Sequence, residues 1–200
     1  MKALRTESEI RFAEEALGRR VSGLLGTPVS HASVVLLRTR MLSLRDRMPP
    51  VVVSSVVKSV CNAWTTSGRF SGPNLPCPFG CRTEGGDKWA HFAACTAIRG
   101  MWRQACPSAN RIFNNLTLER VLMLCPGLTS EAVLEVALWV DVVGHLSYDM
   151  RALGMSPMRT LLEGEDMMSA RLRQLALQSE EARAVIRAIR VAVHISVLIN

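Results

Sequence analysis

The stretch that decides the fold of this chain begins with Cys77-Pro78-Phe79-Gly80-Cys81 and, after nine further residues, continues with His91-Phe92-Ala93-Ala94-Cys95. Its spacing is C-x3-C-x9-H-x3-C. Three cysteines and one histidine are a standard ligand set for structural zinc, where the protein fills all four positions of a tetrahedron. We therefore predict one structural Zn2+ with these ligands: Cys77, Cys81, His91 and Cys95. Because no position stays open for water, such an ion holds structure and does not catalyse hydrolysis.

Each half of the motif has a local reason to bring its ligands together. Pro78 and Gly80 favour a turn between the first two cysteines. His91 and Cys95 are four residues apart on an expected helix, so their side chains would leave the same face. The intervening loop contains Gly85-Gly86 and can fold back. The alternative is that the four side chains are buried without any metal.

The remaining cysteines have other expected roles. Cys106 is a reserve ligand if His91 points away from the site. Cys61 and Cys125 lie in apolar segments that we expect to be helical, and both are expected to be core thiols. No secretory signal opens the sequence, so we expect a soluble protein of the cytoplasm or nucleus, where thiols stay reduced. Every apolar run is interrupted before the roughly 20 residues that a bilayer span needs, so no membrane partner is expected.

The composition favours helix packing around one core. Of the 200 residues, 48% are hydrophobic, 20% are charged and only 5% are aromatic. That length suffices for one core or a core with a small satellite module. We predict a mostly α fold, a helical bundle with the Cys3His zinc knuckle inserted in an irregular loop. Its expected segments are N-terminal helices (1–66), the zinc-knuckle segment with the following helix (67–105), and C-terminal helices (106–200) that pack as one bundle with the first segment.

Capping residues and hydrophobic periodicity predict where the helices lie. The expected positions are a helix opened by Thr6-Glu7-Ser8-Glu9 and stopped at Gly26, a second over 30–47, a third over 51–64, an irregular loop over 65–86, a helix from Asp87 to Ala105, helices capped by Thr117 and Thr129, and a last helix from about Glu165. The helix after Thr129 has an otherwise apolar circumference with one polar stripe, which consists of Glu131, Glu135, Asp141, His145 and Asp149. We therefore expect it to form the buried centre of the bundle.

The last helix carries apolar residues that alternate by four and three between Met168 and Val193, which is a heptad seam. Two interpretations stay open. The seam packs against other helices of the same chain, or it mediates self-association as a coiled coil.

A basic excess surrounds the cysteine motif. The net charge is +7, and the excess lies within the first 116 residues. Aromatic rings that stack on bases, interleaved with cations that meet phosphates, form single-strand binding faces. The candidate nucleic-acid-binding residues are Trp64, Arg69, Arg82, Lys88, Arg99 and Arg103. The alternative for the aromatic residues is that Trp89, Phe92 and Trp102 pack the core of the knuckle.

The segment Asn62-Ala63-Trp64-Thr65-Thr66-Ser67-Gly68-Arg69-Phe70, with the Cys77/Cys81 pair, Asp87, the His91/Cys95 pair and Trp102, resembles the C-terminal region of non-LTR retrotransposon reverse transcriptases, as found in protist reverse-transcriptase-like proteins. The resemblance covers about residues 58–103. It implies a zinc knuckle that handles an RNA template or target DNA. The chain departs from the whole enzyme in having no Tyr-x-Asp-Asp motif, because its only tyrosine is followed by Asp149-Met150-Arg151. Polymerase activity is therefore not implied.

Other enzyme classes find no support in the sequence. No G-x-S-x-G, H-E-x-x-H or P-loop pattern occurs, and His31, His145 and His194 stand alone. Two hypotheses remain. The first is a non-catalytic accessory module that binds RNA or single-stranded DNA. The second is a structural or protein-interaction domain, or a decayed retroelement fragment, with a purely structural zinc.

Overall fold

The chain folds into helices, with a long irregular connection between the third and fourth of them. The computed structural model describes residues 7–64, 66, 75–81, 86–109 and 116–190, and every regular element in these ranges is a helix. The elements are α1 (Glu7–Leu25), α2 (His31–Arg47), α3 (Pro50–Val60), α4 (Trp89–Ala94), α5 (Thr96–Ala105), the short 3-10 turn η2 (Pro107–Ala109), α7 (Leu118–Val121), α8 (Ser130–Ala152), α9 (Pro157–Ala176) and α10 (Glu180–Arg190). The predicted mostly α fold is confirmed.

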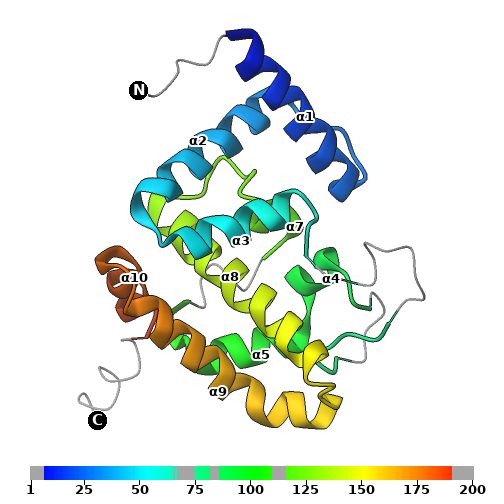
Figure 1. The fold of residues 1–200 in the computed structure, drawn as a ribbon, viewed down its shortest axis with the longest axis vertical. Coiled ribbons are helices and arrows are strands. Elements are labelled where there is room, and N and C mark those ends of the chain that lie inside the picture. Colours follow the sequence, from blue (N-terminus) through cyan, green and yellow to red (C-terminus); the bar gives the residue numbers. More distant parts are fainter. Residues whose placement is uncertain (1–6, 65, 67–74, 82–85, 110–115, 191–200) are drawn as a thin grey trace.

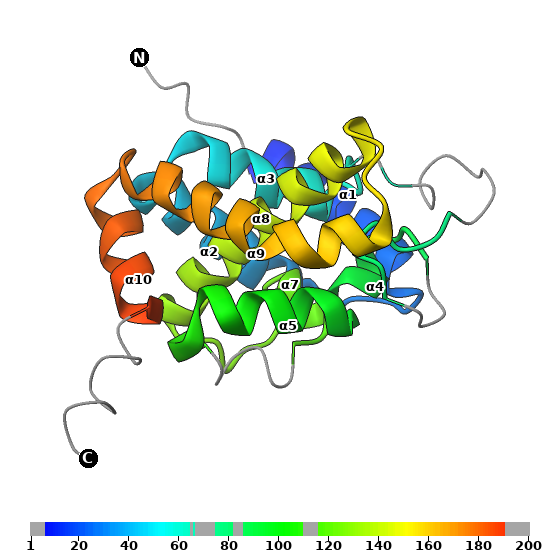
Figure 2. The same cartoon turned by 90° about the horizontal axis from the view of Figure 1, so that it is seen from below.

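Helix α8 forms the centre of the bundle, as its apolar circumference predicts. Helices α2, α3, α7, α9 and α10 all pack against it, and it crosses the middle of the molecule in Figure 1. Most of its residues are buried, among them Trp139, which is 1% exposed. Figure 1 and Figure 2 both show α5 and α9 running side by side, and these two helices pack on each other.

A buried ion pair connects α8 to its neighbours. Asp141 belongs to the polar stripe of α8, yet its side chain is fully buried. It accepts hydrogen bonds from Arg171 Nε of α9 at 2.8 Å and from Ser55 Oγ of α3 at 2.7 Å. A buried carboxylate without such partners would be strongly destabilising, so these contacts determine how α3 and α9 sit on α8.

Several predicted helix ends are confirmed at the level of single hydrogen bonds. Thr117 Oγ1 accepts from the backbone N–H of Arg120, and Thr129 Oγ1 accepts from that of Ala132. Each cap pairs a donor that has no partner within the helix. The predicted helix over 51–64 ends earlier, at Val60, because Asn62 adopts the left-handed conformation with φ 49°. The predicted cap Thr6 lies outside the described residues.

The predicted continuous last helix is wrong. The chain forms α9 from Pro157 to Ala176 and starts again as α10 at Glu180. The restart has a local cause, because Ser179 Oγ accepts the backbone N–H of Ala182 at 3.0 Å and so caps a new helix. The described apolar residues of the seam are buried within the chain: Met168, Leu172, Leu175, Ala182, Ile186 and Ile189. Packing inside the chain accounts for the seam, and self-association stays a prediction.

Arg40 holds a long connection in place beside α8. It lies in α2 and is 8% exposed. Its guanidinium donates to backbone carbonyls between α7 and α8, including that of Cys125 at 2.9 Å and that of Leu128 at 3.1 Å. Burial lowers the pKa of Arg40. The side chain therefore satisfies carbonyl groups that no regular element pairs.

Candidate metal centre

The four predicted ligands meet at one point. Cys77 and Cys81 lie in the connection between α3 and α4, His91 lies in α4, and Cys95 lies between α4 and α5. Their ligand atoms are all within 4.8 Å of one another, so the four residues could hold a metal ion. The Sγ atoms of Cys77 and Cys95 are 3.8 Å apart, and Cys81 Sγ is 3.0 Å from His91 Nε2.

These distances fit ligands that share an ion. In a tetrahedral site with metal–sulfur bonds of about 2.3 Å, two sulfur atoms lie about 3.8 Å apart, and a sulfur and a nitrogen lie about 3.6 Å apart. The Cys77–Cys95 separation of 3.8 Å has the tetrahedral value. It is far longer than the roughly 2.05 Å of a disulfide. The Cys81–His91 pair is closer, at 3.0 Å, which is about 0.6 Å less than the tetrahedral separation of a sulfur and a nitrogen ligand.

Glycines in the left-handed conformation close the loop that carries the two cysteines. Gly80 has φ 74°, and its N–H donates to the carbonyl of Cys77 at 3.0 Å, which forms the predicted turn. Gly86 has φ 60°, and a Cβ there would lie 2.6 Å from the carbonyl oxygen of Leu75. That close approach allows Asp87 N–H to donate to the same oxygen at 3.0 Å. Glycine is thus required where the loop returns to its own start.

The predicted helix over 87–105 is wrong in a way that matters for the site. It consists of α4 and α5, and Cys95 between them has φ −63° and ψ 120°, an extended conformation. Cys95 therefore does not share a helix face with His91. Instead, the change of direction at Cys95 brings its thiol to the other ligands, and its carbonyl accepts the N–H of Arg99 at 3.0 Å as α5 begins.

Asp87, the predicted cap of this helix, has another role. Lys88 occupies the cap position without a side-chain hydrogen bond, while Asp87 is 2% exposed and forms an ion pair with Arg151 of α8. Arg151 also donates to Ser147 Oγ at 3.2 Å. This pair attaches the loop that follows Cys77 and Cys81 to the central helix. Nothing in the sequence signals it, because 64 residues separate its partners.

Aromatic packing provides the second attachment. Phe79, between the two loop cysteines, is fully buried and packs edge-to-face on Phe92, with ring centroids 5.3 Å apart. Trp89 stacks on Trp64 at 5.8 Å and lies 6.1 Å from Trp139 of α8. Such pairs contribute about 0.5–1.5 kcal/mol each beyond their buried area. The ligands are therefore carried by segments that the core already holds.

The two buried thiols share one hydrogen bond, which separates their acidities. Cys77 as donor stabilises the thiolate of Cys95 and lowers the Cys95 pKa to about 5, while the same bond raises the pKa of Cys77. The thiolate is the form that binds metal ions.

The other cysteines lie outside this cluster. All six are within the described residues, and none forms a disulfide. His91 is part of the cluster, so the reserve ligand Cys106 is not needed; Cys106 is buried, and burial raises its pKa to about 12. Cys61 and Cys125 are only half-buried and lie at the end of α3 and after α7, so the expectation of core thiols within helices is wrong.

The candidate nucleic-acid-binding residues that the structure describes lie partly in the core and partly at the surface. Trp64 is 6% exposed, and its Nε1 donates to Ser59 Oγ at 2.7 Å, so it belongs to the core and the expectation that it stacks on bases is wrong. Arg99 is half-buried and donates to the carbonyl of Leu116 at 3.3 Å. Lys88 and Arg103 are exposed. Arg69 and Arg82 lie outside the described residues. The alternative that Trp89, Phe92 and Trp102 pack the core is confirmed.

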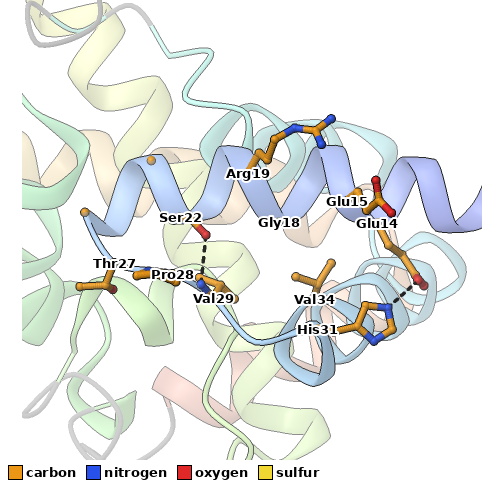
Figure 3. A pocket seen from close by; sticks show the side chains of 12 residues that line it. Glu14, Glu15, Gly18, Arg19, Ser22, Thr27, Pro28, Val29, His31 and Val34 are labelled. Atoms are coloured by element: carbon orange, nitrogen blue, oxygen red, sulfur yellow. Dashed lines mark hydrogen bonds and ion pairs between the residues drawn. The ribbon is translucent and has the colours of Figure 1, made fainter.

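A second concave feature lies between α1, α2 and their connection. This groove, of about 770 Å³, shares no lining residue with the metal centre, and Figure 3 shows Glu14 and His31 meeting at one end of it. His31 Nε2 is 3.2 Å from a Glu14 oxygen, and Arg38 also binds this carboxylate. His145 contacts Asp141 on α8, and His194 lies outside the described residues. The His31 contact joins α1 to α2, and the His145 contact joins successive turns of α8.

No described helix is both long and apolar enough to span a membrane. Comparisons of the chain with protein-family models, curated proteins and solved structures find no match. The resemblance to reverse transcriptases therefore stays an expectation from the sequence.

Proposed function

We propose that the chain is a non-catalytic module whose fold depends on one structural Zn2+ bound by Cys77, Cys81, His91 and Cys95. The observation that supports this proposal is the convergence of four ligand atoms within 4.8 Å of one another. Thiolate sulfur and imidazole nitrogen are donors that favour Zn2+ over Mg2+ or Ca2+. Four protein donors complete a tetrahedron and leave no position at which a metal-bound water could attack a substrate.

The proposed role of the ion is to join the loop to the bundle. Cys77 and Cys81 belong to an irregular connection, whereas His91 lies in α4 and Cys95 lies between α4 and α5. An ion that binds both pairs fixes the loop, and with it Phe79 and Asp87, against α4 and α8. Because such a site does not persist in the unfolded chain, binding and folding are coupled, and the stability rises with the concentration of free zinc, which a chelator lowers.

Metal analysis of the purified full chain tests this proposal. We expect one zinc per chain by elemental mass spectrometry, and cobalt substitution should give the visible absorption of a tetrahedral thiolate site. The variant Cys77→Ala should lose the metal and unfold at a lower temperature. The matched control Cys61→Ala removes a half-buried thiol outside the cluster and should retain one zinc. A chain without stoichiometric metal, or one in which Cys77→Ala retains it, would contradict the proposal.

A second candidate function is binding of RNA or single-stranded DNA through the surface beside the metal centre. It is supported by the net charge of +7, by exposed Lys88 next to α4 and by exposed Arg103 on α5. Backbone contacts by such cations make affinity fall steeply with salt. We expect labelled oligonucleotides to bind at low salt, and Lys88→Glu with Arg103→Glu to weaken binding at least about tenfold.

Arg173→Glu provides the control for charge alone, since Arg173 is an exposed cation on α9. If the zinc-loaded chain binds no oligonucleotide at low salt, or if the control weakens binding equally, the nucleic-acid hypothesis fails. The hypothesis of a structural or protein-interaction domain would then remain. Sedimentation of the zinc-loaded chain measures self-association directly, and a monomer at all concentrations would count against the coiled-coil interpretation.

A further inference from the structure

The three thiols of the metal centre differ in their access to solvent. Cys77 is 3% exposed and Cys95 is 0% exposed, so the protein shields both sulfur atoms. Cys81 is only half-buried and lies at the outer end of the turn that begins at Cys77. A small oxidant arriving from solvent therefore meets Cys81 first, since oxidation follows exposure and thiolate character.

Cys81 also has partners that an oxidised thiol needs. The sulfur atoms of Cys77 and Cys95 both lie within 4.8 Å of its own sulfur. A sulfenic acid condenses with a neighbouring thiol to a disulfide, and a movement of about 2–3 Å would bring either thiol to the bonding distance of about 2.05 Å. Cys61 and Cys125 are half-buried as well, but the structure of the described residues shows no contact between their sulfur atoms and another sulfur.

We propose that Cys81 is an oxidation site through which hydrogen peroxide releases the metal ion. This inference rests on the proposed zinc centre. The disulfide joins Cys81 to Cys77 or Cys95, so oxidation removes two of the four ligands at once. Imidazole and one thiolate then remain, and the ion leaves as Zn2+ because zinc itself has no redox chemistry.

The steps balance without any further reactant. The Cys81 sulfur attacks one oxygen of hydrogen peroxide, an S–O bond forms, the O–O bond breaks, and the departing hydroxide takes a proton to become water. The second sulfur then attacks the Cys81 sulfur, an S–S bond forms and the S–O bond breaks, and the departing hydroxide takes the proton of the second thiol and leaves as a second water. The two thiols lose two electrons, and hydrogen peroxide gains them. Added dithiothreitol reverses the disulfide by exchange.

Oxidation at this site would act on the contacts of the loop with α4 and α8. The loop that loses the ion carries Phe79, which packs on Phe92, and leads to Asp87, which pairs with Arg151 of α8. Release of the loop therefore weakens both attachments to the core. The centre would respond to peroxide by loosening the segment that it orders.

The experiment uses the full chain loaded with one zinc, a chromogenic chelator that reports free zinc, and stepwise addition of hydrogen peroxide. We expect release of one zinc per chain together with a disulfide that contains Cys81, mapped by mass spectrometry of peptides. A sulfenic-acid probe added during the reaction should label Cys81. Dithiothreitol with added zinc should restore the loaded protein.

Two variants make the assignment specific. Cys81→His keeps four ligands of a Cys2His2 set but removes the accessible thiol, so release should slow at least about tenfold. The double variant Cys61→Ser, Cys125→Ser removes the other half-buried thiols and should release zinc at the wild-type rate. If Cys81→His fails to hold zinc, the peptide map and the probe labelling of the wild-type chain decide the question.

The possible failures are distinguishable. A chain that holds no zinc before oxidation refutes both the metal centre and this inference. A loaded chain that keeps its zinc while Cys61 and Cys125 are oxidised refutes only the inference. Release of zinc through a Cys77–Cys95 disulfide, with Cys81 still a free thiol, also overturns the assignment and leaves the metal centre intact.

Discussion

Replacing Gly144 by alanine tests how tightly the aromatic cluster behind the metal centre is packed. Gly144 lies in the middle of α8, and a Cβ built there would be 2.3 Å from Cζ2 and 2.4 Å from Cη2 of Trp64. Carbon atoms in contact normally lie about 3.5–4.0 Å apart, so the overlap exceeds about 1 Å. The ring cannot move away easily, because Trp64 stacks on Trp89 at 5.8 Å and donates to Ser59 at 2.7 Å.

The magnitude follows from two limits. If the surroundings yield and Trp64 keeps its place, overpacking costs about 1–3 kcal/mol. If Trp64 leaves its site, the lost burial of some 150–250 Å² costs at most about 4–6 kcal/mol. Alanine is better than glycine in a helix by about 1 kcal/mol, which offsets part of either cost. We expect Gly144→Ala to lower the free energy of unfolding by about 2–4 kcal/mol.

Urea denaturation of the metal-loaded chain measures this change. Gly100→Ala is the matched control, because Gly100 lies within α5 and a Cβ there would meet no atom within 4 Å beyond its chain neighbours and the backbone of its own helix. The control should stabilise the chain by about 0.5–1 kcal/mol. In a Trp64→Leu background the cost of Gly144→Ala should fall sharply, which assigns the cost to this contact. If Gly144→Ala stabilised the chain as much as the control does, the inferred packing would be refuted.

Three further predictions concern buried charge. Arg40→Ala should lower the free energy of unfolding, measured by urea denaturation, by about 3 kcal/mol or more, because the carbonyls that Arg40 binds lose a charged donor. The control Arg45→Ala, at an exposed position, should change it by less than about 0.5 kcal/mol. Asp87→Asn should weaken zinc binding in a chelator competition, because the loop loses its ion pair with α8. An affinity equal to that of the wild type would refute the coupling between this ion pair and the metal centre. Asp46→Asn, which removes an exposed ion pair, should leave the zinc affinity unchanged. Glu135 has its pKa raised from 4.5 to about 7, chiefly by burial, so the folded chain holds a proton that the unfolded chain has released. Stability should therefore fall as pH rises through this window, by about 1–2 kcal/mol after allowance for partial exposure, and Glu135→Gln should remove this slope from pH-dependent denaturation curves.

The metal centre shows how far local sequence reaches. The convergence of the four candidate ligands follows from composition and spacing, because two short pairs joined by a glycine-containing link can meet whatever the rest of the fold. The route by which Cys95 reaches the site does not follow. The Cys95 thiol could reach the site from a continuous helix, four residues after His91, or from a break between two helices. Only the structure distinguishes these alternatives, and it shows the break.

The nucleic-acid candidates show the opposite limit. A tryptophan among cations has the same sequence pattern whether its ring faces solvent or the core. Trp64 is buried because Gly144, 80 residues later, leaves room for its ring, and no local pattern predicts that match. Exposure of Lys88 and Arg103 keeps the basic surface as a hypothesis, although it loses its expected aromatic member.

Local sequence was enough to predict the helical class, several helix ends and the four side chains that converge as candidate metal ligands. These features depend on hydrogen bonds between residues three apart, such as Thr129 with Ala132, and on the donor chemistry of a few side chains. Only the tertiary structure decided the break at Cys95, the pairing of Asp87 with Arg151 and the burial of Arg40. The physical reason is that each of these depends on which distant groups lack a partner once the helices have packed, and that is a property of the assembled core.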